Sequence, residues 1–162
     1  MTERIWAPWR LEYIEHADDG GGCIFCDKPA ANDDATNHIV SRSKHAFVML
    51  NAFPYSNGHL MVAPFQHTAD LGALSDAEML DLFSLVRDGV KWLTSIYEPQ
   101  GFNVGINLGR SAGAGVDKHV HIHIVPRWTG DTNFMAVVGD TRVIPEALQK
   151  TYERLKEIIE NG

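Results

Sequence analysis

His119-Val120-His121-Ile122-His123-Ile124-Val125-Pro126 is the stretch on which the fold of this 162-residue chain depends. Imidazoles alternate strictly with apolar residues, and this two-residue period is typical of a β-strand with one face toward a core. The three histidines are therefore expected on one face, and the apolar residues between them on the other. Because histidine titrates near neutral pH, neighbouring rings can serve as nucleophile, acid or metal ligand.

A glycine-rich segment, residues 107–118, directly precedes this strand and follows another apolar run, residues 102–108. Such a loop can turn several backbone N–H groups toward one point and bind an anion beside the imidazoles. The first hypothesis is therefore a phosphate held next to a nucleophilic histidine. The alternatives are a metal site on the strand, or histidines with no shared role, and both leave the glycine loop unexplained.

Composition limits the kind of protein. With 44% hydrophobic residues, the chain is expected to form one compact domain with its own core. The formal net charge of −7 argues against non-specific binding to nucleic acid, although Arg110, Lys118 and Arg127 can attract a small anion locally. No stretch is apolar enough to span a bilayer and no apolar signal region begins the chain, so we expect a soluble, cytoplasmic protein without a membrane partner.

The flanking segments predict an α+β domain with an antiparallel sheet of about five strands and two main helices. Residues 46–50 and 59–63 are predicted to form a hairpin, after a polar loop at 30–37. Ser75-Asp-Ala-Glu78 is a capping box, which predicts a helix that continues until Pro99. Its predicted core stripe is Met79, Leu82, Phe83, Val86, Val90, Leu93 and Tyr97. A second amphipathic helix is predicted at 145–159, with Pro145 in its first turn.

Residues 1–22 are predicted to form an N-terminal arm, and residues 23–162 the single globular domain. The arm carries apolar residues without a clean period, among them Trp6 and Trp9, and ends in a glycine-rich joint. Such residues usually dock onto a surface, here that of the domain or of a second subunit. The alternative is that a tryptophan stacks on substrate.

Cys23 and Cys26 form a C-x-x-C pair, a spacing that lets two thiolates reach one metal ion. Two ligands do not complete a tetrahedral site, and the candidates for the other two are His67 and His119. The alternatives are a redox dithiol or two buried cysteines. The favoured interpretation is structural zinc.

Three stretches together resemble the histidine-triad (HIT) superfamily of nucleotide hydrolases and transferases: the triad strand, the glycine loop before it, and Asn51-Ala-Phe-Pro-Tyr-Ser-Asn-Gly-His59. The similarity extends from about Cys23 to the C-terminus. Pro126-Arg-Trp-Thr-Gly-Asp-Thr-Asn-Phe134 and Trp6-Ala-Pro-Trp-Arg10 most resemble the bacterial branch related to diadenosine tetraphosphate phosphorylases. The resemblance implies a HIT-like fold and, commonly, a homodimer.

The resemblance also implies roles for individual residues. His121 is expected to attack the α-phosphorus of a nucleotide, and His123 to stabilise charge on the phosphoryl oxygens. Asn51 is expected to contact the ribose, unless it only caps its turn. Asn107 and the loop residues Gly113, Gly115 and Val116 are expected to bind phosphate. Zinc-containing relatives supply the ligand set Cys23, Cys26, His67 and His119, and a zinc-bound His119 positions the strand instead of acting as general acid.

The expected substrate is a dinucleoside polyphosphate, with diadenosine tetraphosphate the first choice, and the second substrate is inorganic phosphate or water. Many HIT hydrolases carry a glutamine or serine just before the triad, whereas this chain has Gly113-Ala-Gly115-Val-Asp-Lys118. The lost donor could make room for inorganic phosphate, or could indicate weak activity. The alternatives are hydrolysis of a phosphoramidate or dinucleoside polyphosphate, and a nucleotide-binding protein with vestigial catalysis. Uridylyl transfer fits less well, because that branch typically ends its triad with glutamine.

Overall fold

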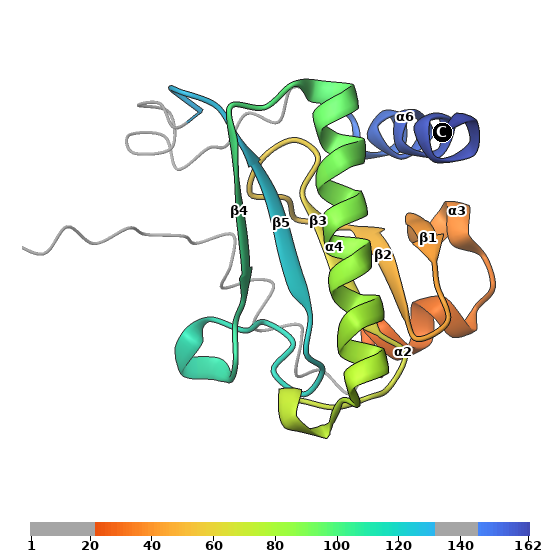
Figure 1. Cartoon of the computed structure of the whole chain (residues 1–162), viewed down its shortest axis with the longest axis vertical. Coiled ribbons are helices and arrows are strands. Elements are labelled where there is room, and N and C mark those ends of the chain that lie inside the picture. The colour runs from red at the N-terminus through yellow and green to blue at the C-terminus, as the bar shows by residue number, and fades with distance from the viewer. Residues whose placement is uncertain (1–21, 132–145) are drawn as a thin grey trace, which may run out of the picture.

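A five-stranded antiparallel sheet is the centre of the molecule (Figure 1). The structure is a computed structural model, and it describes residues 22–131 and 146–162. The strands lie in the order β1-β2-β3-β5-β4, and every neighbouring pair is antiparallel. Their bounds are β1 Ile39–Arg42, β2 Ala46–Leu50, β3 Leu60–Pro64, β4 Gly101–Ile106 and β5 Ile122–Arg127. The helices are α2 Ile24–Ala30, α3 Asp34–Asn37, α4 Asp76–Tyr97 and α6 Leu148–Asn161, with short 3-10 turns at η1 Leu71–Ala73 and η2 Arg110–Ala112. The predicted α+β class, the antiparallel sheet and the two long helices are confirmed.

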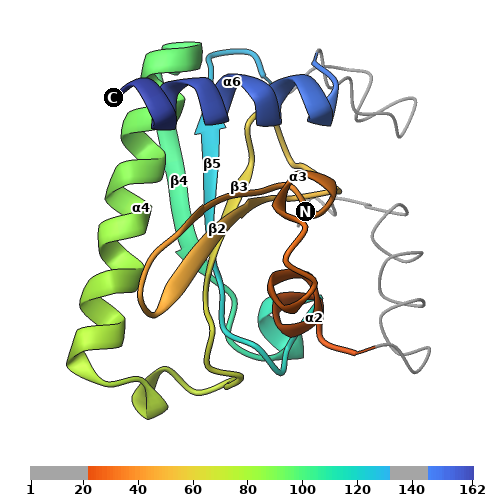
Figure 2. The same ribbon diagram turned by 90° about the vertical axis from the view of Figure 1, so that its right-hand side faces the viewer.

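Helix α4 covers one face of the sheet, and α2 lies on the other (Figure 2). The α4 face holds the larger core, in which Leu60, Ile122 and Ile124 pack against the helix. The α2 face holds a smaller cluster around Phe25, Phe47 and Met61. Because side chains alternate along a strand, each central strand contributes to both cores.

The capping box predicted at the start of α4 is present: Ser75 Oγ accepts from Glu78 N, and the Glu78 carboxylate accepts from Ser75 N. Gly89 faces the sheet, and a Cβ added there would lie 2.9 Å from Ile124 Cδ1, so the glycine permits close packing of helix on strand. One member of the predicted core stripe was wrong. Phe83 is 48% exposed, and Leu85 is buried in its place.

Helix α6 crosses one end of the sheet, where Tyr152 and Leu155 join the larger core (Figure 2). The helix begins at Leu148, with Ala147 as its N-cap residue. It therefore starts later than the predicted residue 145, and Pro145 itself lies outside the described residues. The predicted arm at residues 1–22 also lies outside them except for Gly22, and its role stays a prediction.

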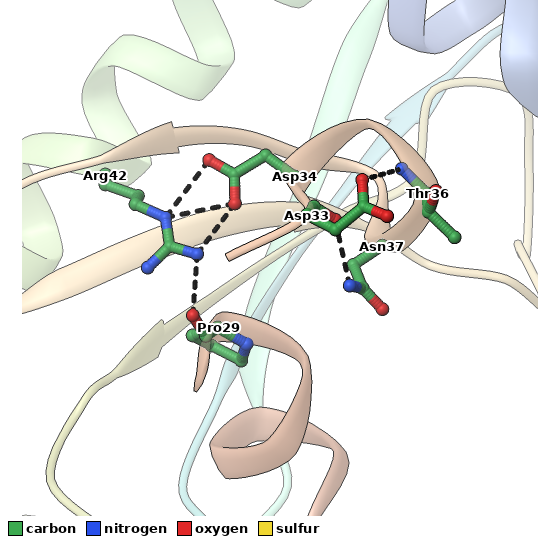
Figure 3. Close-up of polar contacts among 6 residues, drawn as sticks. All are labelled: Pro29, Asp33, Asp34, Thr36, Asn37 and Arg42. Atoms are coloured by element: carbon green, nitrogen blue, oxygen red, sulfur yellow. Dashed lines mark hydrogen bonds and ion pairs between the residues drawn. The ribbon is translucent and has the colours of Figure 1, made fainter. Parts of the chain in front are cut away.

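Residues 30–37 are not a continuous polar loop, as the sequence suggested, because Asp34–Asn37 forms α3. Figure 3 shows the polar contacts that hold this region: Asp33 caps α3 at Thr36, and Arg42 joins the Asp34 carboxylate to the Pro29 carbonyl. Arg42 belongs to β1, a strand that the sequence analysis did not predict. Elements of four residues, such as α3 and β1, are too short to show a period in the sequence. In the structure, the contact between Arg42 and Asp34 joins them.

Two predicted strands also differ in their bounds. The strand predicted at 102–108 is β4, which ends at Ile106, and the strand predicted at 119–125 forms a ladder only from Ile122 onward. Before that ladder, Val120 N donates to Thr68 O at 2.7 Å. In the described part of the chain, no helix combines the length and apolar character that crossing a membrane requires.

Candidate active site and metal centre

The three histidines of the triad lie on the sheet face opposite α4, as the alternation predicted. Val120, Ile122 and Ile124 belong to the α4 core, whereas the Phe25 ring lies 5.3 Å from the His119 ring and 4.6 Å from the His121 ring. His119 and His121 are buried, with 1% and 4% of their surface exposed. The His121 and His123 rings are 4.8 Å apart and nearly perpendicular. The structure therefore brings the three predicted catalytic residues into one cluster.

The tautomer of His121 is set by the backbone. His121 Nδ1 lies 2.8 Å from the carbonyl oxygen of His119. A carbonyl can only accept, so Nδ1 carries the proton and Nε2 keeps its lone pair. Burial lowers the pKa of His121, although the bond to the carbonyl acts in the opposite direction. His121 therefore presents a neutral ring with an unprotonated nitrogen, as nucleophilic attack requires.

A fourth imidazole, which the sequence analysis did not place in the site, lies behind His123. His59 is 0% exposed, and its Nε2 lies 2.9 Å from His123 Nδ1. The backbone N–H of Tyr55 donates to His59 Nδ1 at 3.1 Å. The period of two along β3 puts residue 59 on the same face as Met61, which pairs with His123 in the ladder. The sequence alone does not show that β3 pairs with β5, and without this pairing His59 could not be placed beside His123.

Asn51 follows β2 on the same face of the sheet as the triad. Its Oδ1 accepts from Phe53 N at 2.9 Å, which closes a turn, and its Nδ2 lies 3.3 Å from His59 Nδ1. The turn-capping alternative for Asn51 is thus present in the structure. A ribose contact stays a prediction, since an amide oxygen that accepts one bond keeps a second lone pair.

The glycine loop between β4 and β5 turns through positive φ angles at Gly109 and Gly113, +80° and +89°. The N–H groups of Ala112, Gly113 and Ala114 all donate to carbonyls inside this loop. The amide of Gly113, one of the residues predicted to bind phosphate, donates to Arg110 O at 2.8 Å, and a phosphate contact of Gly113 stays a prediction. Arg110 also pairs with Asp117 at 3.3 Å, which lowers the positive charge it offers to an anion.

Of the other loop residues predicted to bind phosphate, Val116 packs against the Phe25 cluster. Asn107, Gly115 and Val116 are each partly exposed. Their position in the loop that leads to the triad is compatible with the predicted role, which stays a prediction.

Four predicted metal ligands converge at one point: the ligand atoms of Cys23, Cys26, His67 and His119 all lie within 4.8 Å of one another. His119 Nδ1 is 3.3 Å from Cys23 Sγ and 3.6 Å from Cys26 Sγ, and His67 Nδ1 is 3.3 Å from Cys26 Sγ. Zn–S and Zn–N bonds of normal length place neighbouring tetrahedral ligands about 3.6 Å apart. The four side chains could therefore bind one metal ion in a tetrahedral site, with two sulfur and two nitrogen ligands.

The hydrogen bonds of His119 and the pKa of Cys26 are also compatible with a bound metal ion. His119 Nε2 bonds the carbonyl oxygen of Pro64 at 2.9 Å, so the lone pair of this ring lies on Nδ1, toward the two sulfurs. Burial, together with the hydrogen bond and charge of Cys23, raises the pKa of the Cys26 thiol to about 11. Two close thiolates are therefore unfavourable unless a cation lies between them.

Helix α2 connects the cluster of candidate metal ligands to His121. Cys23 is its N-cap residue and Cys26 lies in its first turn, with Phe25 between them. Phe25 is 1% exposed and packs on the rings of His119 and His121. An ion bound by the two cysteines would hold this aromatic ring against His121.

A buried imidazole with a directed lone pair, two adjacent imidazoles and a glycine loop define a site suited to group transfer from a phosphate ester. The HIT domain model matches residues 32–130, and the chain therefore belongs to the HIT family. It is 36% identical over 159 residues to the AP-4-A phosphorylase of Mycobacterium tuberculosis, an alignment that covers 93% of this chain and 81% of the relative.

Two further relatives show the range of the family. The adenosine 5'-monophosphoramidase hnt1 of Schizosaccharomyces pombe is 35% identical over 105 residues, which cover 65% of this chain and 74% of hnt1. The crystal structure of a Zn-bound histidine triad family protein from Mycobacterium smegmatis has the same fold, with a TM-score of 0.69 and 23% identity over 86% of this chain and 94% of that one. These relatives are named as enzymes of nucleotide chemistry or as histidine-triad proteins.

Proposed function

We propose that this protein is a nucleotidyl transferase, a phosphorylase of dinucleoside polyphosphates that forms a covalent nucleotidyl-histidine intermediate on His121. The observation that carries this proposal is the hydrogen bond from His121 Nδ1–H to the His119 carbonyl, 2.8 Å long, which leaves Nε2 as a neutral nucleophile. The 36% identity to a protein named AP-4-A phosphorylase supports diadenosine tetraphosphate as the substrate.

In the first step, the Nε2 lone pair of His121 attacks the α-phosphorus. A P–N bond forms, the bond from phosphorus to the bridging oxygen breaks, and the leaving nucleoside polyphosphate keeps the electron pair. In the second step, an oxygen of inorganic phosphate attacks the same phosphorus and the P–N bond breaks. With diadenosine tetraphosphate the products are ATP and then ADP.

The neighbouring residues bind and orient the nucleotide. His123 and the amides of Gly115 and Val116 stabilise charge on the phosphoryl oxygens, and Asn107 orients the phosphate. Asn51, fixed by its turn to Phe53, contacts the ribose. Residues 113–116, just before the triad, carry no side-chain donor, and this absence supports inorganic phosphate as the second substrate.

Zinc is the proposed structural cofactor, bound by Cys23, Cys26, His67 and His119. A bound ion would stabilise the two thiolates and crosslink α2 to the segment before β5, and no step of the transfer requires it. A cytoplasmic location is proposed as well, and it is supported by a C-x-x-C pair, a spacing typical of a metal or redox pair and not of a disulfide framework.

A homodimer is also proposed, and the edge strand β4 supports it. Within the described residues, β4 pairs only with β5, so its outer backbone edge lacks a neighbouring strand. Val104 is 46% exposed on this strand and Leu108, just beyond it, is 50% exposed. A long exposed edge with apolar side chains favours pairing with a second copy of the chain.

The second candidate function uses water in place of phosphate, and it is favoured by the identity to a monophosphoramidase. The experiment that separates the two incubates purified protein with diadenosine tetraphosphate, with and without inorganic phosphate, and resolves the products by anion exchange. ADP and ATP that appear only with phosphate are expected. AMP and ATP without phosphate would make the protein a hydrolase, and no turnover of this substrate or of a phosphoramidate would favour a nucleotide-binding protein.

A further inference from the structure

The two cysteines of the chain lie next to each other on the outer side of the candidate metal cluster. Cys23 and Cys26 are each partly exposed and His67 is exposed, whereas His119, on the inner side, is 1% exposed. Cys23 is the N-cap residue of α2, and Cys26 N donates to Cys23 O at 2.8 Å, so one turn of backbone brings the two residues together. A small solute can therefore approach this pair from the solvent.

The sulfurs of this pair are close enough to bond to each other after a small movement. The ligand atoms of the cluster all lie within 4.8 Å of one another, and a disulfide needs two sulfurs about 2.05 Å apart. Buried cysteines are inert, whereas an accessible cysteine beside a second one is typical of a redox-sensitive pair. A sulfur in a disulfide carries no thiolate charge, so the pair can bind a metal ion or form a disulfide, but not both.

We propose that Cys23 and Cys26 are a site of reversible oxidation, at which hydrogen peroxide converts the two thiolates that bind the proposed metal ion into a disulfide. One thiolate attacks a peroxide oxygen, the O–O bond breaks, and a sulfenic acid and hydroxide form. The second thiolate attacks the sulfenic sulfur, the S–S bond forms, and a second hydroxide leaves. The two sulfurs lose two electrons to the peroxide, and two protons convert the hydroxides into water.

The disulfide removes two of the four ligands from the cluster. His67 and His119 alone do not complete a tetrahedral site, so zinc is released. In a reducing compartment such a disulfide is transient, because cellular thiols reduce it and restore the ligands. This inference rests on the zinc site that belongs to the proposed function, and it is independent of the transfer reaction on His121.

Phe25 links this oxidation to the triad. It lies between the two cysteines, it is 1% exposed, and its ring is 4.6 Å from the His121 ring. Formation of the S–S bond moves the turn that holds this ring, whereas the His119 carbonyl still accepts the proton of His121 Nδ1. Oxidation should therefore slow turnover several-fold without abolishing it.

The test treats the full chain, reduced and loaded with zinc, with hydrogen peroxide. A chromogenic chelator measures the released zinc, and mass spectrometry after alkylation counts the free thiols. Because the chain has only two cysteines, the loss of two hydrogens and of both alkylation sites identifies this disulfide. We expect one zinc to be released for each disulfide formed, and dithiothreitol with added zinc to restore both the metal and the turnover.

Several results would overturn the inference: thiols that stay free, sulfinic acids without a disulfide, or a disulfide that joins two chains on a non-reducing gel. Cys26→His is the matched variant, because it keeps a metal ligand but removes one sulfur. Peroxide should release zinc from this variant several-fold more slowly, and Cys23→His is the second variant of the same kind. Release at the wild-type rate from either would show that the disulfide is not the cause.

The zinc content and the turnover of the reduced protein are measured before oxidation. A reduced wild type without zinc would overturn this inference together with the proposed metal site. Absence of turnover with zinc present would count against the proposed transfer reaction only, because the release of zinc and the disulfide are measured without substrate. In an active protein, unchanged turnover after oxidation would contradict the link through Phe25.

Discussion

The carbonyl oxygen of His119 accepts the Nδ1 proton of His121 over 2.8 Å, while the Nδ1 atom of the same His119 faces the sulfurs of Cys23 and Cys26. One residue thus belongs to two candidate sites: its backbone sets the tautomer of the proposed nucleophile, and its ring completes the proposed set of metal ligands. The two functions use different atoms, so they can be separated by experiment.

His121→Asn should lower turnover of diadenosine tetraphosphate by at least about 10³-fold, because the amide nitrogen offers no lone pair for attack on phosphorus. The fold and nucleotide affinity should remain, since the asparagine keeps a donor near the His119 carbonyl. Initial rates, with binding measured by calorimetry, check both statements. Wild-type-like turnover by this variant would remove the nucleophile assignment.

Removal of the metal should destabilise the fold more than it impairs the chemistry. We expect about one zinc per chain by elemental analysis, and Cys26→Ser should lose it and lower the Tm by about 10 °C. The fraction that stays folded should keep measurable turnover. His45→Ala serves as a control with unchanged metal content, and a Cys26→Ser protein with the Tm of the wild type would rule out a structural ion.

Gly89→Val should lower the free energy of unfolding by about 2–3 kcal/mol, because even a Cβ at this position lies 2.9 Å from Ile124 Cδ1 and 3.4 Å from Leu60 Cδ1. Urea unfolding followed by circular dichroism measures the change. Arg87→Val, at a mostly exposed position of the same helix, controls for the helix propensity of valine. Equal effects of the two substitutions would argue against the close packing of α4 on β5.

The acid stability of the protein should depend on Glu146, which accepts from Tyr97 and Thr151 and pairs with Arg154. Burial alone raises the pKa of Glu146, but these hydrogen bonds and the guanidinium outweigh it and lower the pKa below its ordinary value. A lowered pKa in the folded state stabilises the fold at neutral pH, and this contribution is lost as the pH falls through that pKa.

Glu146→Gln should therefore lower the free energy of unfolding at neutral pH by about 1–2 kcal/mol, and the difference from the wild type should shrink as the pH approaches about 3. Denaturant unfolding at a series of pH values measures it, with the exposed Glu157→Gln as control. A difference that grows toward acid pH would contradict the assigned direction.

Val104→Lys should convert the proposed homodimer into a monomer, because it puts a charge on the exposed face of the edge strand β4. Sedimentation equilibrium at micromolar concentration measures the mass, and Ser95→Lys on the exposed side of α4 serves as control. A wild type that sediments only as a monomer would refute the dimer.

Much of the fold could be predicted because long elements carry strong periods. The alternation through residues 119–125 correctly separated the histidines from the core side chains, and the capping box at Ser75 correctly located the start of α4. The C-x-x-C pair and two distant histidines were predicted to lie together, and the structure brings all four side chains into one cluster. Phe83 was misplaced because a helix that crosses a sheet buries the side facing the strands, and the sequence pattern alone does not fix that angle.

Other features depend on pairings that a single sequence does not show. His59 follows an Asn-Gly turn and seemed to be only the first residue of a strand. Its contact with His123 exists because β3 lies beside β5 in a particular register. The protons on the imidazoles are likewise determined by the backbone groups of His119 and Tyr55, which carry no mark in the side-chain sequence.

Because a main-chain oxygen holds His121, the proposed nucleophile, the tautomer of that ring does not depend on which side chain occupies position 119. Every amino acid supplies the same carbonyl there, so the metal ligand could be exchanged over evolutionary time without altering the protonation of His121. Loss of the proposed ion would lower the stability of the fold and leave the main-chain acceptor of the His121 proton in place. Exchange of His119 for another residue would therefore remove a proposed metal ligand without removing the group that fixes the proton of His121.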